Sequence, residues 1–287
     1  HAEKYARVIK HIESELLGEA GQNGLDVTTI TGPYRHFPRW LLVQFAAQRL
    51  GWKKFFLTGG VRKVFIVNAW KRAMIAGAQA ADIIRWTWNT FGTKAVLTQS
   101  MANTALAYLI NQVAPEIPVV FLDTGYHFPE TIETRDALQA RTSLNIISLT
   151  PKQTVTEQDA EFGANLWERD PDLCCKMRKV EPLENLIHGY EAWITGMRHE
   201  TAPHRAAVPV VQFDESRGVL KIAPILHWSE AQLLRYTMEN DVPVNPLMYD
   251  GYPSIGCAPC TKRVAPGDDP RAGRWAGQGK NECGLHT

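Results

Sequence analysis

The sequence has almost no net charge, no uninterrupted apolar run of membrane-spanning length and no even set of cysteines. The formal net charge of +1 over 287 residues provides no global field that would attract nucleic acid or an anionic bilayer. The most apolar stretch, from Phe55 to Trp70, is interrupted by two glycines and two basic residues, which excludes a membrane-spanning helix there. Five cysteines without a paired framework are typical of intracellular thiols. We therefore expect a cytoplasmic protein without a membrane segment.

Acidic residues are also absent from one long segment, since no Asp or Glu occurs between Val27 and Ala81. The basic residues of this segment, with aromatic residues interleaved among them, are Arg35, Arg39, Arg49, Lys53, Lys54, Arg62, Lys63, Lys71 and Arg72. Such an arm can contact nucleic acid or direct targeting, and a plain surface extension has the same composition. We treat residues 1–80 as a basic N-terminal extension of unknown role.

From Asp82 onward, short apolar runs alternate with segments of helical periodicity. The expected strands are Ala95–Gln99, Pro118–Leu122, Asn145–Leu149, Ala192–Thr195 and a hairpin of Val210–Phe213 with Val219–Ile222. The expected helices are Met101–Val113, Pro129–Ser143, a segment from Cys174 toward Ile187, and one from Ser229 to about Glu239. This order predicts an α/β domain over residues 81–287, with a mainly parallel sheet flanked by helices and ligands at the carboxyl ends of its strands. Beyond Asn245, frequent proline and glycine predict a loop-rich C-terminal part.

Four of the five cysteines occur as two close pairs. Cys174 and Cys175 are adjacent, and Cys257 and Cys260 form a C-x-x-C. A C-x-x-C alone is compatible with redox chemistry, zinc binding or a structural role, but adjacent cysteines converge poorly on one metal ion. They can each bind a different iron of a cubane, so the set favours a four-iron, four-sulfur (4Fe–4S) cluster over zinc or unrelated thiols. Basic neighbours would offset the negative charge of a cluster: Lys176, Arg178, Lys179, Lys262 and Arg263.

The fifth cysteine, Cys283, stands alone in a polar, glycine-containing tail. Nearby Lys280 and His286 would favour its thiolate, whereas Glu282 would oppose it. If the other four thiols bind metal, no resolving cysteine remains, so a covalent intermediate on Cys283 would need an external thiol for its release. An incidental exposed cysteine is the alternative interpretation.

Several ordered motifs between Asp82 and His286 resemble those of the assimilatory adenylyl-sulfate (APS) reductases, within the wider phosphoadenylyl-sulfate reductase family. The motifs are Leu122-Asp123-Thr124-Gly125, Phe128-Pro129-Glu130-Thr131, Cys174-Cys175 with Arg178-Lys179, Thr195-Gly196-Met197-Arg198, Gly256-Cys257-Ala258-Pro259-Cys260, Arg271-Ala272-Gly273-Arg274-Trp275 and Glu282-Cys283-Gly284-Leu285-His286. The resemblance implies an adenine nucleotide alpha hydrolase-like sheet and a 4Fe–4S cluster bound by Cys174, Cys175, Cys257 and Cys260.

The resemblance also implies an activity in sulfate assimilation and cysteine biosynthesis. Cys283 would attack the sulfur of APS, expel AMP and carry an S-sulfocysteine, which reduced thioredoxin or a similar dithiol donor would cleave to release sulfite. The residues implied to hold the phosphosulfate group are Lys179, Arg271 and Arg274. The residues implied to line the nucleotide pocket are Ser100, Asp123, Thr124, Gly125 and Arg198, and His286 would anchor the closed tail.

The loop after the first expected strand departs from the family pattern. Gln99 stands where Ser is usual and Asn103 where Asp is usual, while Ser100 can still bind a phosphate oxygen at a helix N-terminus. The loop also lacks the Gly-Gly and acidic residue of a related ATP pyrophosphatase, which disfavours an adenylating ligase. Two alternatives stay open: a reductase that accepts the 3′-phosphorylated nucleotide as well or instead, and a non-catalytic metal-cluster module. The sequence indicates no oligomeric state.

Overall fold

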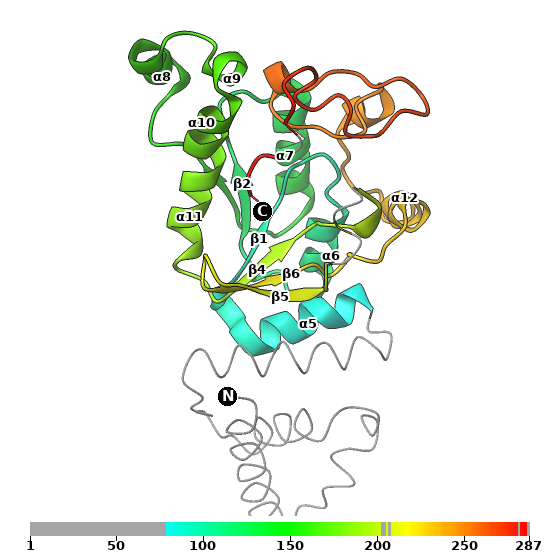
Figure 1. The fold of residues 1–287 in the computed structure, drawn as a ribbon. Coiled ribbons are helices and arrows are strands. Elements are labelled where there is room, and N and C mark those ends of the chain that lie inside the picture. Colours follow the sequence, from blue (N-terminus) through cyan, green and yellow to red (C-terminus); the bar gives the residue numbers. More distant parts are fainter. Residues whose placement is uncertain (1–78, 202–204, 206–207, 281, 286–287) are drawn as a thin grey trace, which may run out of the picture. The chain divides into compact units, whose positions relative to one another are not determined.

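A mixed sheet of six strands runs through the part of the chain that the structure, a computed structural model, describes: residues 79–201, 205, 208–280 and 282–285. Its order is β3-β2-β1-β4-β6-β5, and within this sheet only the β5–β6 pair is antiparallel (Figure 1). The strands are β1 (Ala95–Thr98), β2 (Val119–Leu122), β3 (Ile146–Leu149), β4 (Ala192–Thr195), β5 (Val211–Asp214) and β6 (Val219–Ile222). The predicted α/β class and the predicted hairpin are confirmed. The arm from Val27 to Ala78 lies outside the described residues.

Helices and short helical turns connect these strands. The helices are α5 (Ala80–Phe91), α6 (Ala105–Val113), α7 (Pro129–Arg141), α8 (Val155–Phe162), α9 (Leu166–Arg169), α10 (Pro171–Cys175), α11 (Glu181–Ile187) and α12 (Glu230–Glu239). The turns are η2 (Gly92–Lys94), η3 (Lys176–Val180), η4 (His199–Thr201), η6 (Pro246–Tyr249) and η7 (Ala258–Cys260). Ser229 begins α12 with a reciprocal capping box to Gln232, as the sequence predicts. None of the described helices has the length and apolar character needed to span a membrane.

The helices cover both faces of the sheet. On one face, Leu183 and Ile187 of α11 pack against the wholly buried Trp193 of β4 and its neighbours Val96 and Val120. Figure 1 shows α6 and α7 on the opposite face, as right-handed crossovers from β1 to β2 to β3 require. The return from β3 to β4 passes through α11, so the connection changes face at the centre of the sheet.

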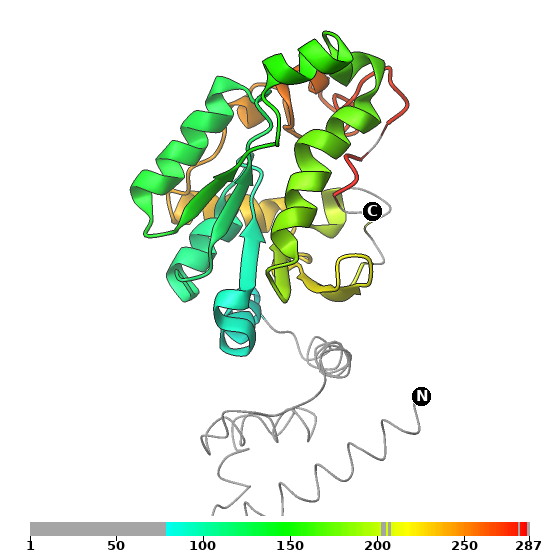
Figure 2. The same cartoon turned by 90° about the vertical axis from the view of Figure 1, so that its left-hand side faces the viewer.

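The order in which strands are added to the sheet reverses between β1 and β4. Strands β2 and β3 extend to one side of β1, and β4, β6 and β5 extend to the other. In open α/β sheets, ligands bind beyond the carboxyl ends of the strands at such a point. Figures 1 and 2 show the loops after Asn245, coloured orange to red, lying over this edge, and the predicted loop-rich C-terminal part contains just the short turns η6 and η7 among its described residues.

The helix predicted for Met101–Val113 begins four residues later, at Ala105. Met101 adopts a left-handed backbone conformation with φ of 59°, which interrupts a helix at that position. The Asn103 side chain accepts a hydrogen bond from the Ala105 backbone N–H at 2.8 Å, and Thr104 donates to the Pro243 carbonyl at 2.6 Å. These local and long-range bonds hold residues 99–104 as a loop above the sheet, because short polar side chains compete with helical hydrogen bonding.

Candidate active site and metal centre

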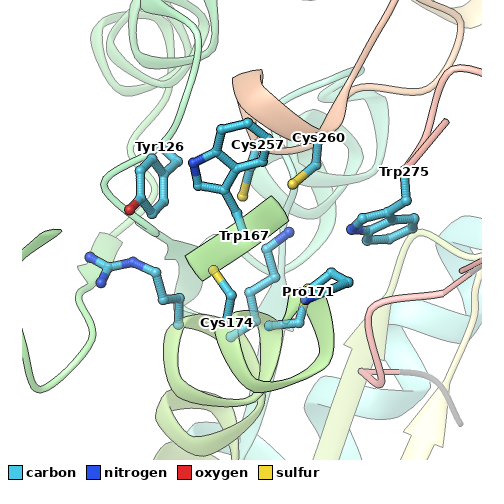
Figure 3. A pocket seen from close by; sticks show the side chains of 10 residues that line it. Tyr126, Trp167, Pro171, Cys174, Cys257, Cys260 and Trp275 are labelled. Atoms are coloured by element: carbon cyan, nitrogen blue, oxygen red, sulfur yellow. The ribbon is translucent and has the colours of Figure 1, made fainter. Parts of the chain in front are cut away.

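The two cysteine pairs come together in one pocket. Cys174 and Cys175 from α10, and Cys257 and Cys260 from the loop around η7, line it together with aromatic and basic side chains. In Figure 3 the sulfur atoms of Cys257 and Cys260 point toward α10, and that of Cys174 points back toward them. All four thiols, and Cys283, are free cysteines. Among the described residues there is no group of three or more His, Cys, Asp or Glu side chains arranged to hold a metal ion.

The segment that carries Cys174 and Cys175 is built by local capping and a wide turn. The Asp170 side chain accepts a hydrogen bond from the Leu173 N–H at 2.9 Å, and Pro171 occupies the first turn of α10. The following five residues form a π-helical turn, η3, a conformation that often occurs at functional sites. This turn buries both of its last basic side chains, Arg178 and Lys179, which are 3% and 9% exposed.

Arg178 joins the cysteine-bearing helix to the loop after β2. Its Nε donates to the Thr124 carbonyl at 2.6 Å, its Nη1 donates to the buried Gln158 at 2.9 Å, and its guanidinium lies over the Tyr126 ring at 5.2 Å. Gly125 has φ of 72°, and a Cβ there would lie 3.1 Å from Arg178 Nη2. The predicted motif glycine is therefore required by its backbone conformation and by the close approach of Arg178.

The loop that carries Cys257 is also bonded to the segment after β2. The Ala258 N–H donates to the Tyr126 carbonyl at 2.7 Å, and the Thr261 hydroxyl donates to the Cys257 carbonyl at 2.8 Å. The Thr124 Oγ1 lies 3.3 Å from the Cys257 sulfur. Thr124, predicted for the nucleotide pocket, is wholly buried and directs its hydroxyl toward the cysteine.

Electrostatics differ among the four thiols. Burial, reinforced by the neighbouring cysteines, raises the pKa of Cys174 to about 12 and that of Cys260 to about 11. Burial also opposes ionisation of Cys257, but the Lys179 ammonium and the Thr124 hydroxyl outweigh it and lower the pKa of that thiol. Thiolates crowded in this pocket therefore need added positive charge, and Cys257 already has it.

Lys179 lines the four-cysteine pocket and interacts electrostatically with the tail cysteine. Burial by itself would lower the pKa of the Lys179 ammonium, but the sulfur atoms of Cys257 and Cys283 outweigh it and raise this pKa. The thiol of Cys175 also interacts electrostatically with Cys283. Cys283 is therefore close to the pocket although more than a hundred residues separate it from Cys175, and Lys179 is the buried cation that both share.

Arg274 stacks at the side of the pocket. Its guanidinium lies 4.4 Å from the Trp275 ring centroid, and its Nη1 donates to Ser254 Oγ and the Ile255 carbonyl at 3.4 Å each. A Cβ on Gly256 would lie 2.3 Å from Arg274 Nη2, so the guanidinium occupies the space that the glycine leaves open. Stacking on Trp275 orients the planar guanidinium of Arg274. Because its hydrogen bonds to the protein are long, its N–H groups can still donate to an anion.

The tail around Cys283 is held by two arginines. Glu282 accepts from Arg205 Nη2 at 2.6 Å and forms an ion pair with Arg271 Nη2 at 3.2 Å. Arg271, predicted to hold substrate, is thus paired with the residue that precedes Cys283. The sequence analysis missed Arg205, because no motif or spacing distinguishes it from a surface arginine, and His286 lies outside the described residues.

The other predicted nucleotide-binding residues follow the carboxyl ends of β1, β2 and β4. Ser100 is exposed, and the Asp123 carboxylate accepts a hydrogen bond from the Gly125 N–H at 3.1 Å. Arg198 is 8% exposed and donates to Glu230 at 2.5 Å. The three strands place these residues along one edge, but Arg198 is already occupied by a carboxylate.

Gln99 and Asn103, the two residues that depart from the expected family pattern, both have hydrogen-bonded side chains. The Gln99 side-chain amide donates to the Asn103 carbonyl at 2.8 Å. Asn103 accepts from the Ala105 N–H through its amide oxygen, as an aspartate would, and donates to the Thr237 hydroxyl at 3.3 Å. The loop is therefore stable with these residues, and its exposed Ser100 stays accessible.

The chain belongs to the family described by the phosphoadenosine phosphosulfate reductase domain, whose model matches residues 94–263. Two similar relatives are both named adenosine 5′-phosphosulfate reductase. The Streptomyces coelicolor protein is 56% identical over 209 residues, which cover 73% of this chain and 89% of the relative. The Mycolicibacterium smegmatis protein is 49% identical over 215 residues, which cover 75% of this chain and 91% of the relative.

A solved structure has a similar fold. It is a phosphoadenylyl-sulfate (PAPS) reductase from Candida auris in a phosphate complex, 30% identical to this chain with a TM-score of 0.58. The similarity covers 66% of this chain and 92% of that one. This neighbour supports the predicted sheet of the adenine nucleotide alpha hydrolase-like type.

Proposed function

We propose that this protein reduces APS to sulfite and AMP, in assimilatory sulfate reduction and cysteine biosynthesis, through an S-sulfocysteine on Cys283. The observation that carries the proposal is the position of Lys179, a buried cation that lines the four-cysteine pocket and is followed by Val180, against which Gly284, the residue after Cys283, lies. The relatives named adenosine 5′-phosphosulfate reductase support APS as the substrate, because the match extends over about nine-tenths of their length.

The reaction balances with one external dithiol. The Cys283 thiolate forms a bond to the sulfur of APS, and the bond between that sulfur and the bridging oxygen breaks, so the electron pair leaves with AMP. Reduced thioredoxin or a similar dithiol then attacks the Cys283 sulfur, and sulfite leaves with the sulfur–sulfur bonding pair. The second thiol of the donor closes its own disulfide and returns Cys283 to the thiolate. The donor supplies both electrons.

Cationic side chains around Cys283 would hold the phosphosulfate group. Lys179 lines the four-cysteine pocket and interacts electrostatically with Arg274, which supports both as substrate ligands. Arg271 would exchange Glu282 for the substrate. Fixed positive charge at this position stabilises the charge that develops on the leaving phosphate. The proposed nucleotide-binding residues are Ser100, Asp123, Thr124, Gly125 and Arg198, and His286 would anchor the tail.

We propose that the four-cysteine pocket holds a 4Fe–4S cluster, on the chemistry of its donor set. Its donors are the free thiols of Cys174, Cys175, Cys257 and Cys260, which two distant segments supply. Arg178 and Lys179 are buried beside these thiols and provide the positive charge that a cluster with four thiolates requires. When bound, the cluster would supply a cross-link between the segments and a fixed negative charge, with no open coordination position for substrate.

Mass spectrometry tests this function directly. The protein is mixed with APS without a reductant, and Cys283 is expected to gain the mass of a sulfo group. The adduct should disappear on addition of reduced thioredoxin, and Cys283→Ser should never form it while keeping its iron. Absence of the adduct from iron-replete wild-type protein, or sulfite release by Cys283→Ser, would overturn the assignment.

A second candidate substrate is the 3′-phosphorylated nucleotide, because the Candida auris neighbour is described as a PAPS reductase. Parallel single-turnover reactions with APS and its 3′-phosphorylated analogue separate the two, since the preferred substrate forms the adduct faster. We also infer a cytoplasmic location, because unpaired thiols persist in a reducing compartment.

A further inference from the structure

The β5–β6 hairpin reaches the tail that carries Cys283 through one arginine whose side chain is 7% exposed. Arg217, in the turn between the two strands, lies over the Trp193 ring at 5.6 Å and donates to Asp214 Oδ2 at 2.9 Å. Its Nη2 also donates to the Gly284 carbonyl at 3.5 Å, the long end of the hydrogen-bonding range. Gly284 directly follows Cys283, so the hairpin contacts the backbone next to the nucleophile.

Apolar packing supports the same contact. Leu285 is packed against the buried cluster that contains Trp193 of β4 and Val219 of β6. Gly284 has φ of 83°, and a Cβ there would lie 3.3 Å from a Val180 methyl group. The backbone after Cys283 is therefore confined between the hairpin and η3, in a conformation that favours glycine. We call Asp214, Arg217 and the Trp193 face the hairpin dock.

The contacts on the two sides of Cys283 differ in whether an anionic substrate can displace them. Glu282, on the N-terminal side, is held by Arg205 and Arg271, and Arg271 is a proposed substrate ligand. Substrate and Glu282 therefore compete for one guanidinium. The contacts of Gly284 and Leu285 use a backbone carbonyl and an apolar side chain, which an anionic substrate does not displace.

We infer that the hairpin dock orients Cys283 for attack while Arg271 exchanges Glu282 for the substrate. Arg217 is a positioning residue in this scheme: it acts on the reaction through the tail backbone. The inference depends on the proposed function only for its kinetic consequence. The docking of the tail is a property of the free protein, and it can be measured without substrate.

Two variants test the dock from opposite sides. Arg217→Gln removes the guanidinium, and Leu285→Ala removes the apolar contact without altering the hairpin. Arg85→Gln is the control, because Arg85 forms an exposed pair with Asp82. The first readout, on full-length iron-replete protein without nucleotide, is the rate of Cys283 alkylation by iodoacetamide, measured by peptide mass. Both variants should react at least about threefold faster than wild type, and the control should not, because undocking exposes the thiol.

The second readout is the single-turnover rate of sulfo-adduct formation from APS. Both variants should lose about tenfold or more in this rate with less than about twofold change in APS affinity, because misplacement of a reacting atom by about 1 Å costs up to about a hundredfold. Arg217→Lys should recover part of the rate by restoring the positive charge. The inference would be overturned by an unchanged rate of Cys283 alkylation in the variants. It would also be overturned by faster alkylation with an unchanged rate of sulfo-adduct formation. If Arg217→Gln does not fold, Leu285→Ala decides the matter alone.

The alkylation readout keeps the two hypotheses separate. If wild-type protein forms no adduct with APS, the proposed function fails. Faster alkylation of Cys283 in both variants than in wild type would then still support binding of the tail by the hairpin dock. Alkylation rates equal to wild type would rule that binding out.

Discussion

The substitution Gly256→Ala should displace the guanidinium of Arg274 and so remove its proposed contact with substrate, although Arg274 itself is unchanged. A Cβ at position 256 would lie 2.3 Å from Arg274 Nη2, 2.5 Å from its Cζ and 3.0 Å from its Nε. All three atoms belong to the guanidinium, so the new methyl group overlaps the planar fork as a whole. The side chain can relieve this overlap only by leaving its stacked position on Trp275. Gly256 has no positive φ that alanine could not adopt, so backbone strain is not part of the effect.

The magnitude follows from the interactions that the displaced guanidinium would lose with substrate. A hydrogen bond to a charged group contributes about 1.5–3 kcal/mol, which corresponds to a loss of about tenfold to about a hundredfold in kcat/KM for APS. The stacked orientation of Arg274 is the structural reason to expect charge-assisted bonds of this strength. Iron content should stay unchanged, because neither position supplies a thiol to the pocket.

The assay compares kcat/KM for Gly256→Ala, Arg274→Ala and the double variant. Because both substitutions remove the same interaction, the double variant should lose no more than Arg274→Ala alone, whereas independent effects would add. Gly189→Ala is the control, since the nearest atom to its added Cβ is the Leu186 carbonyl oxygen at 3.4 Å. Wild-type kinetics in Gly256→Ala, or additive losses in the double variant, would refute the reasoning.

Three further predictions concern stability and cofactor content. Cys257→Ala should lose iron and visible absorption, because it removes one ligand of the proposed cluster, whose binding would be coupled to folding; an unchanged spectrum counts against ligation. Gly273→Ala should lower the free energy of unfolding by about 1–3 kcal/mol, because its Cβ would lie 2.1 Å from the Lys262 carbonyl oxygen; an unaltered urea midpoint contradicts this. Burial lowers the pKa of Lys221 from 10.5 to about 8. Below about pH 8 the folded protein therefore carries the charged ammonium in a buried place, and this lowers its stability. Lys221→Met should therefore be more stable than wild type near pH 7, and urea unfolding should show this advantage shrinking as the pH rises above about 8; a difference independent of pH argues against the shift.

Much of the fold follows from local patterns. The strands Ala192–Thr195 and Val219–Ile222 have the predicted bounds, because short apolar runs beside glycine and turn residues encode strands locally. Ser229 begins α12 through a bond to a residue three positions away. The start of α6 was predicted wrongly, because the bond from Thr104 to the Pro243 carbonyl joins segments far apart in sequence.

The sequence by itself determined the alternation of strands and helices, the two cysteine pairs and the separate tail cysteine. Only the tertiary structure decided that Arg205 holds Glu282, that Thr124 faces Cys257 and that Arg217 reaches Gly284. Periodicity and capping depend on neighbours within a few residues. The partner of a buried cation depends instead on which distant segments the sheet brings to one edge, and that is settled when the whole chain packs.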